Sequence, residues 1–154
     1  MNILQTPVRF YPAIGGVETV VLGLSHALAQ RGHNVHVLTS DQPSAQPTAL
    51  DGIRITRLRT AAKLANTNIT PALPIWLARE KFDIVHTHLP TPWSADWSAW
   101  VGRLRGKAVV TSFYNDIVGR GAAGAFARAY NATAFKMLLR VSHRLITLTP
   151  EHIS

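Results

Sequence analysis

The chain has 154 residues, of which 47% are hydrophobic and 16% charged, so it carries enough apolar surface to offset chain entropy and is not an intrinsically disordered protein. It contains no cysteine, which excludes a disulfide framework and a zinc–thiolate site. Sixteen Lys and Arg against eight Asp and Glu give a net charge of +8, which favours anionic partners such as nucleic acid, anionic lipid or phosphorylated small molecules.

Short segments rich in β-branched and aliphatic residues alternate along the chain with helical patterns. This alternation predicts an α/β fold, a Rossmann-like open parallel sheet of about six strands with helices on both faces, and the length predicts one domain over residues 1–154. In such a sheet, ligands bind outside the carboxyl ends of the strands, near the point where strand order reverses. The predicted strands cover residues 2–6, 34–40, 53–59, 82–88, 108–114 and 144–149.

The segment after the first predicted strand, PVRFYPAIGGVE, places two glycines directly before a helix whose apolar residues recur with helical period from Val17 to Leu28. The amides at a helix start attract phosphate, and glycine lets a ligand approach them closely. Gly15 and Gly16 match neither the dinucleotide fingerprint nor the Walker pattern. The spacing leaves open a phosphate site and a simple tight turn, and it leaves Arg9 open as an added positive charge or a solvated side chain.

A loose loop is predicted over residues 44–52 and a helix over about 71–80. Asp41 ends the second predicted strand about 25 residues after the glycines, roughly where a dinucleotide-binding fold holds the ribose. An alternative interpretation is therefore a nucleotide-binding Rossmann module without catalysis of its own. The missing third glycine argues against this alternative.

The fourth predicted strand ends in HTHLPTPW, where His86 and His88 share one face because side chains alternate along a strand. We expect one buried, hydrogen-bonded histidine, and His88 facing the ligand crevice. With no cysteine and no third ligand nearby, we expect no metal site. In the helix predicted over residues 94–104, Asp96 either orients a substrate or belongs to the first turn. The spacing of the tryptophans places them on one helix face, which favours the core or its rim over a sugar-stacking platform. These residues are Trp93, Trp97 and Trp100.

The fifth predicted strand runs into SFYNDIVGRG, which offers the polar side chains of Tyr114, Asn115, Asp116 and Arg120 on a loop. An Asx turn leading into the next helix explains the same residues equally well. That next helix, predicted from residue 122 to about 141, interleaves apolar and basic side chains. Such a helix either lies on an anionic membrane or packs as an ordinary helix on the sheet.

Nucleic acid is not a predicted partner, because the arginines are dispersed and no nucleic-acid-binding motif is present. Neither a signal peptide nor an apolar run of about 18 residues is visible. We expect a cytoplasmic protein, with peripheral contact at the inner face of the membrane as an open alternative.

Three blocks of the sequence together resemble the amino-terminal domain of GT-B glycosyltransferases, specifically the retaining family 4, also called group 1. These blocks are ILQTPVRFYPAIGGVETVVLGLSHALAQRGHNVHVLTS, FDIVHTHLP and AVVTSFYNDI. The most specific part combines Pro12, the tetrad at residues 15–18 and the triad at residues 31–33, and the resemblance covers essentially the whole chain.

The resemblance implies half of a two-domain enzyme, in which an acceptor-binding amino-terminal domain faces a nucleotide-sugar-binding carboxy-terminal domain across a cleft. It implies that the backbone at Gly15 and Gly16 contacts the donor diphosphate, with one glycine making the turn and the other leaving room for a phosphate oxygen. The family often has an active-site histidine just after the fifth strand, where this chain has Tyr114. Tyrosine donates a hydrogen bond but does not carry a proton at neutral pH as imidazole does.

From the resemblance we expect transfer of a sugar from a nucleotide diphosphate sugar to a lipid-linked or glycan acceptor, with retention and without a cofactor. The donor-binding domain lies outside the 154 residues, so the isolated domain is expected to be inactive until that half is supplied in cis or in trans. The residues expected to act are Tyr114 and His88 in catalysis, Gly15 and Gly16 on the donor, and Arg9, Asn115, Asp116 and Arg120 on the acceptor.

Overall fold

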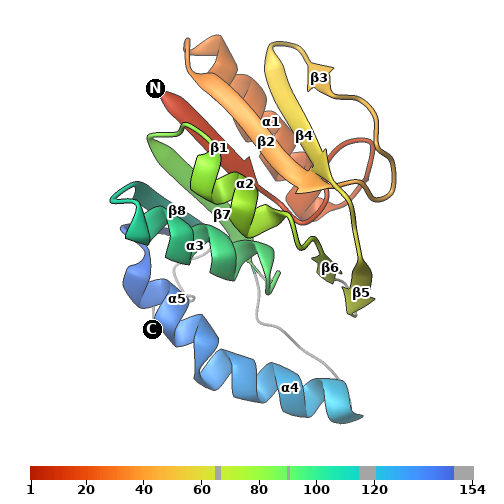
Figure 1. Cartoon of the computed structure of the whole chain (residues 1–154), viewed down its shortest axis with the longest axis vertical. Coiled ribbons are helices and arrows are strands. Elements are labelled where there is room, and N and C mark those ends of the chain that lie inside the picture. Colours follow the sequence, from red (N-terminus) through yellow and green to blue (C-terminus); the bar gives the residue numbers. More distant parts are fainter. Residues whose placement is uncertain (65–66, 90, 115–120, 148–154) are drawn as a thin grey trace.

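A computed structural model of the protein describes residues 1–64, 67–89, 91–114 and 121–147 (Figure 1). All six predicted strands are confirmed, and a seventh, short strand joins them in one sheet. The strands of this sheet are β1 (Asn2–Thr6), β2 (Asn34–Ser40), β3 (Ala49–Leu50), β4 (Ile53–Leu58), β7 (Ile84–Leu89), β8 (Ala108–Phe113) and β9 (Arg144–Thr147).

The sheet runs in the order β3-β4-β2-β1-β7-β8-β9, and only the pair β3 and β4 is antiparallel. The chain adds β2 and β4 on one side of β1 and later adds β7, β8 and β9 on the other. Strand order therefore reverses at β1, and the crevice between the carboxyl ends of β1 and β7 is the place where such sheets bind ligands. The predicted α/β class and open parallel sheet are confirmed.

The helices cover the two faces of the sheet unequally, with α1 on one face and α2 and α3 on the other (Figure 1). Val35 and Val37 of β2 pack toward α1, whereas Leu38 belongs to the core cluster under α2 and α3. Because both faces are covered, the central strands are buried almost throughout. The helices are α1 (Gly16–Gln30), α2 (Leu73–Arg79), α3 (Ser94–Leu104), α4 (Gly121–Ala132) and α5 (Ala134–Val141).

The prediction of a single helix from residue 122 to about 141 is wrong, because the segment divides at Thr133. The Thr133 hydroxyl donates to the carbonyl of Ala129 at 2.6 Å, and its backbone has left the helical region with φ −122°. A threonine that bonds back to its own preceding turn competes with the helical hydrogen-bond ladder. Two shorter helices result, and α5 packs on the core through Leu138.

Three short strands lie where the sequence indicates loop or no regular element. The predicted loop over residues 44–52 contains β3, which pairs with β4. Farther along, β5 (Ala62–Leu64) and β6 (Thr67–Ile69) form a separate antiparallel pair. Figure 1 places this pair beyond the carboxyl ends of β2 and β4, at the edge of the sheet where a ligand is expected. Strands of two or three residues are too short for alternation to reveal them.

Candidate functional site

The loop between β1 and α1 is anchored in the core rather than free. Phe10 is fully buried in the cluster under α1, Val8 is also buried, and the amide of Ala13 donates to the carbonyl of Phe10 at 3.1 Å. Ile14, in contrast, is 97% exposed. The exposed tip of the loop at Ile14 lies directly before the glycines. The buried side chains of Val8 and Phe10 hold the loop in place.

The two glycines play different steric roles at the start of α1. A Cβ on Gly15 would lie 2.3 Å from Oε2 of Glu18, so a carboxylate occupies the space that a side chain would need. A Cβ on Gly16 would meet no described atom within 4 Å. The first helical hydrogen bond runs from the amide of Thr19 to the carbonyl of Gly15 at 2.9 Å, so the amides before Thr19 have no partner within the helix. Gly16 thus places no side chain over these amides, while the Glu18 carboxylate lies beside Gly15.

Arg9 and a hairpin line a cavity next to this helix start. Arg9 is not simply solvated, because its Nε donates to Oε1 of Glu18 at 3.1 Å. The cavity has a volume of about 560 Å³ and lies at the carboxyl ends of β1, β2 and β4. Its polar lining comes from the loop, from the first turn of α1, from the segment after β2 and from the β5–β6 pair. The polar residues include Arg9, Glu18, Gln42, Lys63 and Asn68.

A second group of buried polar side chains lies on the neighbouring strands β1, β7 and β8. One ring nitrogen of His88, Nε2, lies 2.9 Å from Oε1 of Gln5, and the other, Nδ1, lies 3.1 Å from the hydroxyl of Tyr114. His86 bonds to the hydroxyl of Ser112 at 2.8 Å, and the two histidine rings lie 4.4 Å apart. His88 is fully buried and His86 is 5% exposed.

The expectation that His88 faces the crevice is therefore wrong, and the expectation of a buried, hydrogen-bonded histidine holds for both. Burial lowers the pKa of His86 to about 4. Burial, followed by repulsion from His86, holds the pKa of His88 well below its ordinary value. Both rings are neutral at physiological pH, and burial also raises the pKa of the half-buried Tyr114. Among the described residues of this group, only Tyr114 is partly exposed, and it directly follows the carboxyl end of β8.

Acidification is expected to destabilise the fold through these rings. Unfolding restores His86 to a pKa near 6.5 from about 4, so the unfolded chain binds more protons between these values and the free energy of unfolding falls as pH drops through them. His86 alone accounts for up to about 3 kcal/mol of this loss. Urea unfolding at pH values from about 7 to about 4.5 measures it.

The control for this pH dependence is His86→Asn, which keeps a polar group for Ser112 but does not titrate. The variant should flatten the dependence by the amount assigned to His86. A wild-type free energy of unfolding that stays constant across the same pH range would contradict the assignment.

Three of the residues expected on the acceptor lie outside the described residues, namely Asn115, Asp116 and Arg120. Asp96 accepts from the backbone amide of Trp93 at 3.2 Å and from the hydroxyl of Tyr130 at 2.6 Å. One oxygen of Asp96 thus caps the start of α3 and the other joins α3 to α4. This favours a structural role for Asp96 over a role in binding substrate.

Asp41 and the tryptophans also have structural partners. Oδ1 of Asp41 accepts from the amide of Thr60 at 3.0 Å, which ties β2 to the segment after β4. Trp93 donates from its indole nitrogen to the carbonyl of Thr70 at 3.2 Å and meets Trp97 edge to face, with ring centroids 6.0 Å apart. Trp97 is 39% exposed, which places these rings at the rim of the core as expected.

Sequence reasoning missed Gln5 and Ser112 in the histidine group, and it missed Lys63 and Asn68 in the cavity. The available signal was a glutamine inside a strand that is otherwise apolar and buried. A side chain with both a donor and an acceptor is retained in such a place only where it finds partners. Lys63 and Asn68 belong to the short hairpin, which carries no recognisable pattern.

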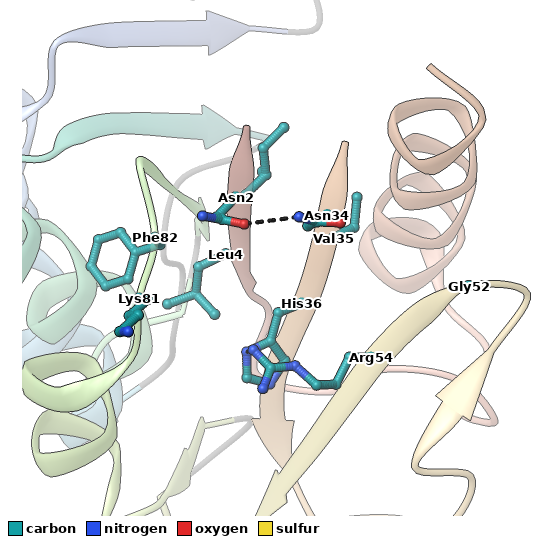
Figure 2. A pocket seen from close by; sticks show the side chains of 10 residues that line it. Asn2, Leu4, Asn34, Val35, His36, Gly52, Arg54, Lys81 and Phe82 are labelled. Atoms are coloured by element: carbon teal, nitrogen blue, oxygen red, sulfur yellow. Dashed lines mark hydrogen bonds between the residues drawn. The ribbon is translucent and has the colours of Figure 1, made fainter. Parts of the chain in front are cut away.

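A second cavity, of about 310 Å³, lies at the opposite edge of the sheet, by the amino ends of β1 and β2 (Figure 2). Asn34 donates to Asn2 at 3.1 Å beside it. His36, Arg54 and Glu80 form a network there, with Nη2 of Arg54 2.9 Å from Nδ1 of His36 and paired with the Glu80 carboxylate. The polar groups already satisfy one another, and the amino ends of parallel strands are not where such sheets bind ligands.

Within residues 1–64, 67–89, 91–114 and 121–147, no three His, Cys, Asp or Glu side chains are grouped so that they could hold a metal ion. In the same part of the chain, each helix is too short or too polar to cross a bilayer.

Residues 14–152 match the model of the protein family described as Glycosyltransferase Family 4. A GDP-mannose:cellobiosyl-diphosphopolyprenol alpha-mannosyltransferase of Komagataeibacter xylinus is 30% identical over 129 residues, covering 79% of this chain and 32% of that protein. A phosphatidyl-myo-inositol mannosyltransferase of Propionibacterium freudenreichii is 32% identical over 89 residues, covering 49% of this chain and 23% of that protein. The chain thus spans about a third or less of the length of these relatives.

Solved structures with a similar fold include a sucrose-phosphate synthase from Thermosynechococcus elongatus, with a TM-score of 0.68 and 20% identity over 99% of this chain and 43% of that one. MurG of Acinetobacter baumannii matches with a TM-score of 0.60 and 17% identity over 97% of this chain and 41% of that one.

Proposed function

This chain belongs to glycosyltransferase family 4, and from that membership we propose that it is the acceptor-side domain of an enzyme that transfers a sugar, with retention, from a nucleotide diphosphate sugar to a lipid-linked acceptor. The names of both curated relatives specify mannosyl transfer, and one names GDP-mannose. We therefore take GDP-mannose as the first donor to test. The fold is that of one Rossmann-like half of a GT-B enzyme.

The observation that carries this proposal is the start of α1 beside a polar cavity at the carboxyl ends of β1, β2 and β4. The amides of the first turn, which make no hydrogen bond within the helix, and the positive end of the helix dipole suit a diphosphate. The empty space at Gly16 lets an oxygen approach those amides without a steric clash. We assign the donor diphosphate to this position.

The acceptor is assigned to the cavity of about 560 Å³. Lys63 contributes positive charge to its lining, where Arg9 is paired with Glu18, and Gln42 and Asn68 contribute amide groups. Positive charge suits the phosphate of a lipid-linked acceptor, and amides suit sugar hydroxyls. The names of the two curated relatives, a diphosphopolyprenol and a phosphatidyl-inositol enzyme, support an acceptor of this chemistry.

Peripheral contact with an anionic membrane follows from such an acceptor. The two interpretations of the basic helix are compatible in α5, because Leu138 packs on the core while Lys136, Met137 and Arg140 are exposed. Exposed basic side chains beside an apolar one favour an anionic lipid surface. We include this contact in the proposed function.

Transfer and acceptor binding are tested separately. Incubated with GDP-mannose and a polyprenyl-diphosphate disaccharide, the 154-residue chain is expected to give no product, whereas the chain completed with a carboxy-terminal family 4 domain is expected to transfer mannose with an α linkage. Calorimetry should show that the isolated chain binds the acceptor head group. Robust turnover by the isolated chain would overturn the proposed division of labour, and failure to bind the head group would overturn the acceptor assignment.

A further inference from the structure

A chain of three polar side chains crosses the sheet at its carboxyl edge, from Gln5 on β1 through His88 on β7 to Tyr114 after β8. We propose that Gln5 and His88 are positioning residues that set whether the Tyr114 hydroxyl donates or accepts a hydrogen bond toward a ligand at this edge. This inference rests on the proposed function, because the ligand that Tyr114 would meet is the bound sugar or phosphate.

The first step is the protonation of the His88 ring. Gln5 and His88 are both fully buried, and a neutral imidazole has one N–H donor and one lone pair. Where Oε1 of Gln5 faces Nε2 of His88 at 2.9 Å, the proton must lie on Nε2, because the amide oxygen can only accept. Nδ1 then carries the lone pair and accepts from the Tyr114 hydroxyl at 3.1 Å. In this arrangement Tyr114 donates inward, and its oxygen, which also hydrogen-bonds to Ser112, keeps one lone pair for the ligand.

The amide nitrogen of Gln5 allows a second arrangement of the same three side chains. Nε2 of Gln5 is buried and has no hydrogen-bond partner in the described part of the chain. Turning the amide over brings this nitrogen to His88 as a donor, moves the ring proton to Nδ1 and makes His88 donate to the Tyr114 oxygen. The hydroxyl hydrogen of Tyr114 then points outward. Each arrangement leaves one amide atom of Gln5 unpaired, and the structure has the one in which Oε1 faces His88.

The consequence is a choice of ligand group at Tyr114. With the proton directed inward, Tyr114 accepts from a sugar hydroxyl, and with the proton directed outward, it donates to a phosphate or other anionic oxygen. His88 touches no ligand in this scheme, since it is fully enclosed and both ring nitrogens are engaged. It acts through Tyr114, which is a different role from the catalytic one expected from the sequence.

The first experiment reads the His88 ring directly by long-range ¹H–¹⁵N spectra of the ¹⁵N-histidine-labelled chain. We expect the wild-type ring to carry its proton on Nε2, and we expect Gln5→Met, which has a similar length but no amide, to give a mixture of both ring forms. The matched control is Thr87→Val on the same strand, because the buried Thr87 hydroxyl has no hydrogen-bond partner in the described part of the chain and its loss should leave the His88 ring unchanged. Identical ring forms in the wild type and Gln5→Met would overturn the positioning role of Gln5.

Tyr114→Phe keeps the ring but removes the hydroxyl, and it serves if Gln5→Met fails to fold. It should shift the Nδ1 resonance of His88 as its hydrogen-bond donor is lost, and an unshifted resonance would overturn the Tyr114 link.

The second experiment uses the completed enzyme. Tyr114→Phe is expected to lower kcat about tenfold with little change in the KM for the donor. Gln5→Met is expected to lower kcat about twofold, because a mixture of ring forms leaves about half of the enzyme in the competent form. The double variant is expected to fall no further than Tyr114→Phe, because both residues act through one hydroxyl. Transfer at the wild-type rate by a folded Gln5→Met enzyme would overturn the inference. Absence of transfer by the wild-type enzyme, with the ring forms as expected, would instead overturn the proposed function and leave the hydrogen-bond chain intact.

Discussion

The Gly16→Leu variant of the completed enzyme is expected to raise the KM for the nucleotide sugar at least about tenfold, while the domain folds as before. A hydrogen bond between a backbone amide and a charged phosphate contributes about 1.5–3 kcal/mol, and a leucine side chain over the start of α1 would block it. The fold should tolerate leucine because a Cβ at this position meets no described atom within 4 Å. Initial rates over a range of GDP-mannose concentrations measure the effect, with thermal unfolding to verify the fold.

Gly23 supplies the matched control, because it lies in the same helix and a Cβ there also meets no described atom within 4 Å. Gly23→Leu should leave the KM unchanged and stabilise the helix by about 0.5–1 kcal/mol, since glycine is a poor helix former. If Gly16→Leu leaves the KM at its wild-type value, the glycine pair is a turn and not a donor contact.

The Phe10→Ala variant is expected to lose about 3–5 kcal/mol of unfolding free energy, the usual cost of deleting a buried aromatic ring. Phe10 is fully enclosed by the cluster that includes Val21, Val37 and Ile55. Such a loss is a large share of the roughly 5–15 kcal/mol that stabilises a typical domain. Urea unfolding followed by far-UV circular dichroism measures it.

Tyr11 is the control for this substitution, because it is the next residue and is 43% exposed. Tyr11→Ala is expected to cost less than about 1 kcal/mol, as surface substitutions usually do. A cost for Phe10→Ala as small as that would show that the ring does not anchor the loop. Since Phe10 holds the segment that ends in Gly15, loosening it should also weaken donor use in the completed enzyme.

Much of the fold was predictable because its signals are local. Runs of β-branched residues predicted the six longer strands, and the boundaries of α3 at Ser94 and Leu104 agree with the prediction. The β5–β6 hairpin was not predictable, because strands of three residues are stabilised by the pairing itself rather than by a residue pattern. Likewise, the periodicity of residues 122–141 predicts one helix and does not register the hydroxyl of Thr133 that divides it.

The candidate site was predictable only in part. The glycines and Arg9 lie near one another because they are neighbours in the chain, and their placement at the start of a helix follows from the sequence. Whether a histidine is exposed or buried depends on the residues that pack around it. For His88 these residues include Gln5 and Tyr114, which are far from it in the sequence. That is why His88 was expected at the crevice and is instead fully buried.

The sequence by itself determined the α/β class, the family resemblance and the position of the glycine loop after the first strand, because each depends on residues close together in the chain. Only the tertiary structure decided that Gln5, His88 and Tyr114 form one hydrogen-bonded group. Gln5 and His88 are 83 positions apart, and His88 and Tyr114 are 26 apart. Their meeting depends on the parallel register of β1, β7 and β8, which is set by the packing of the whole sheet between its helices.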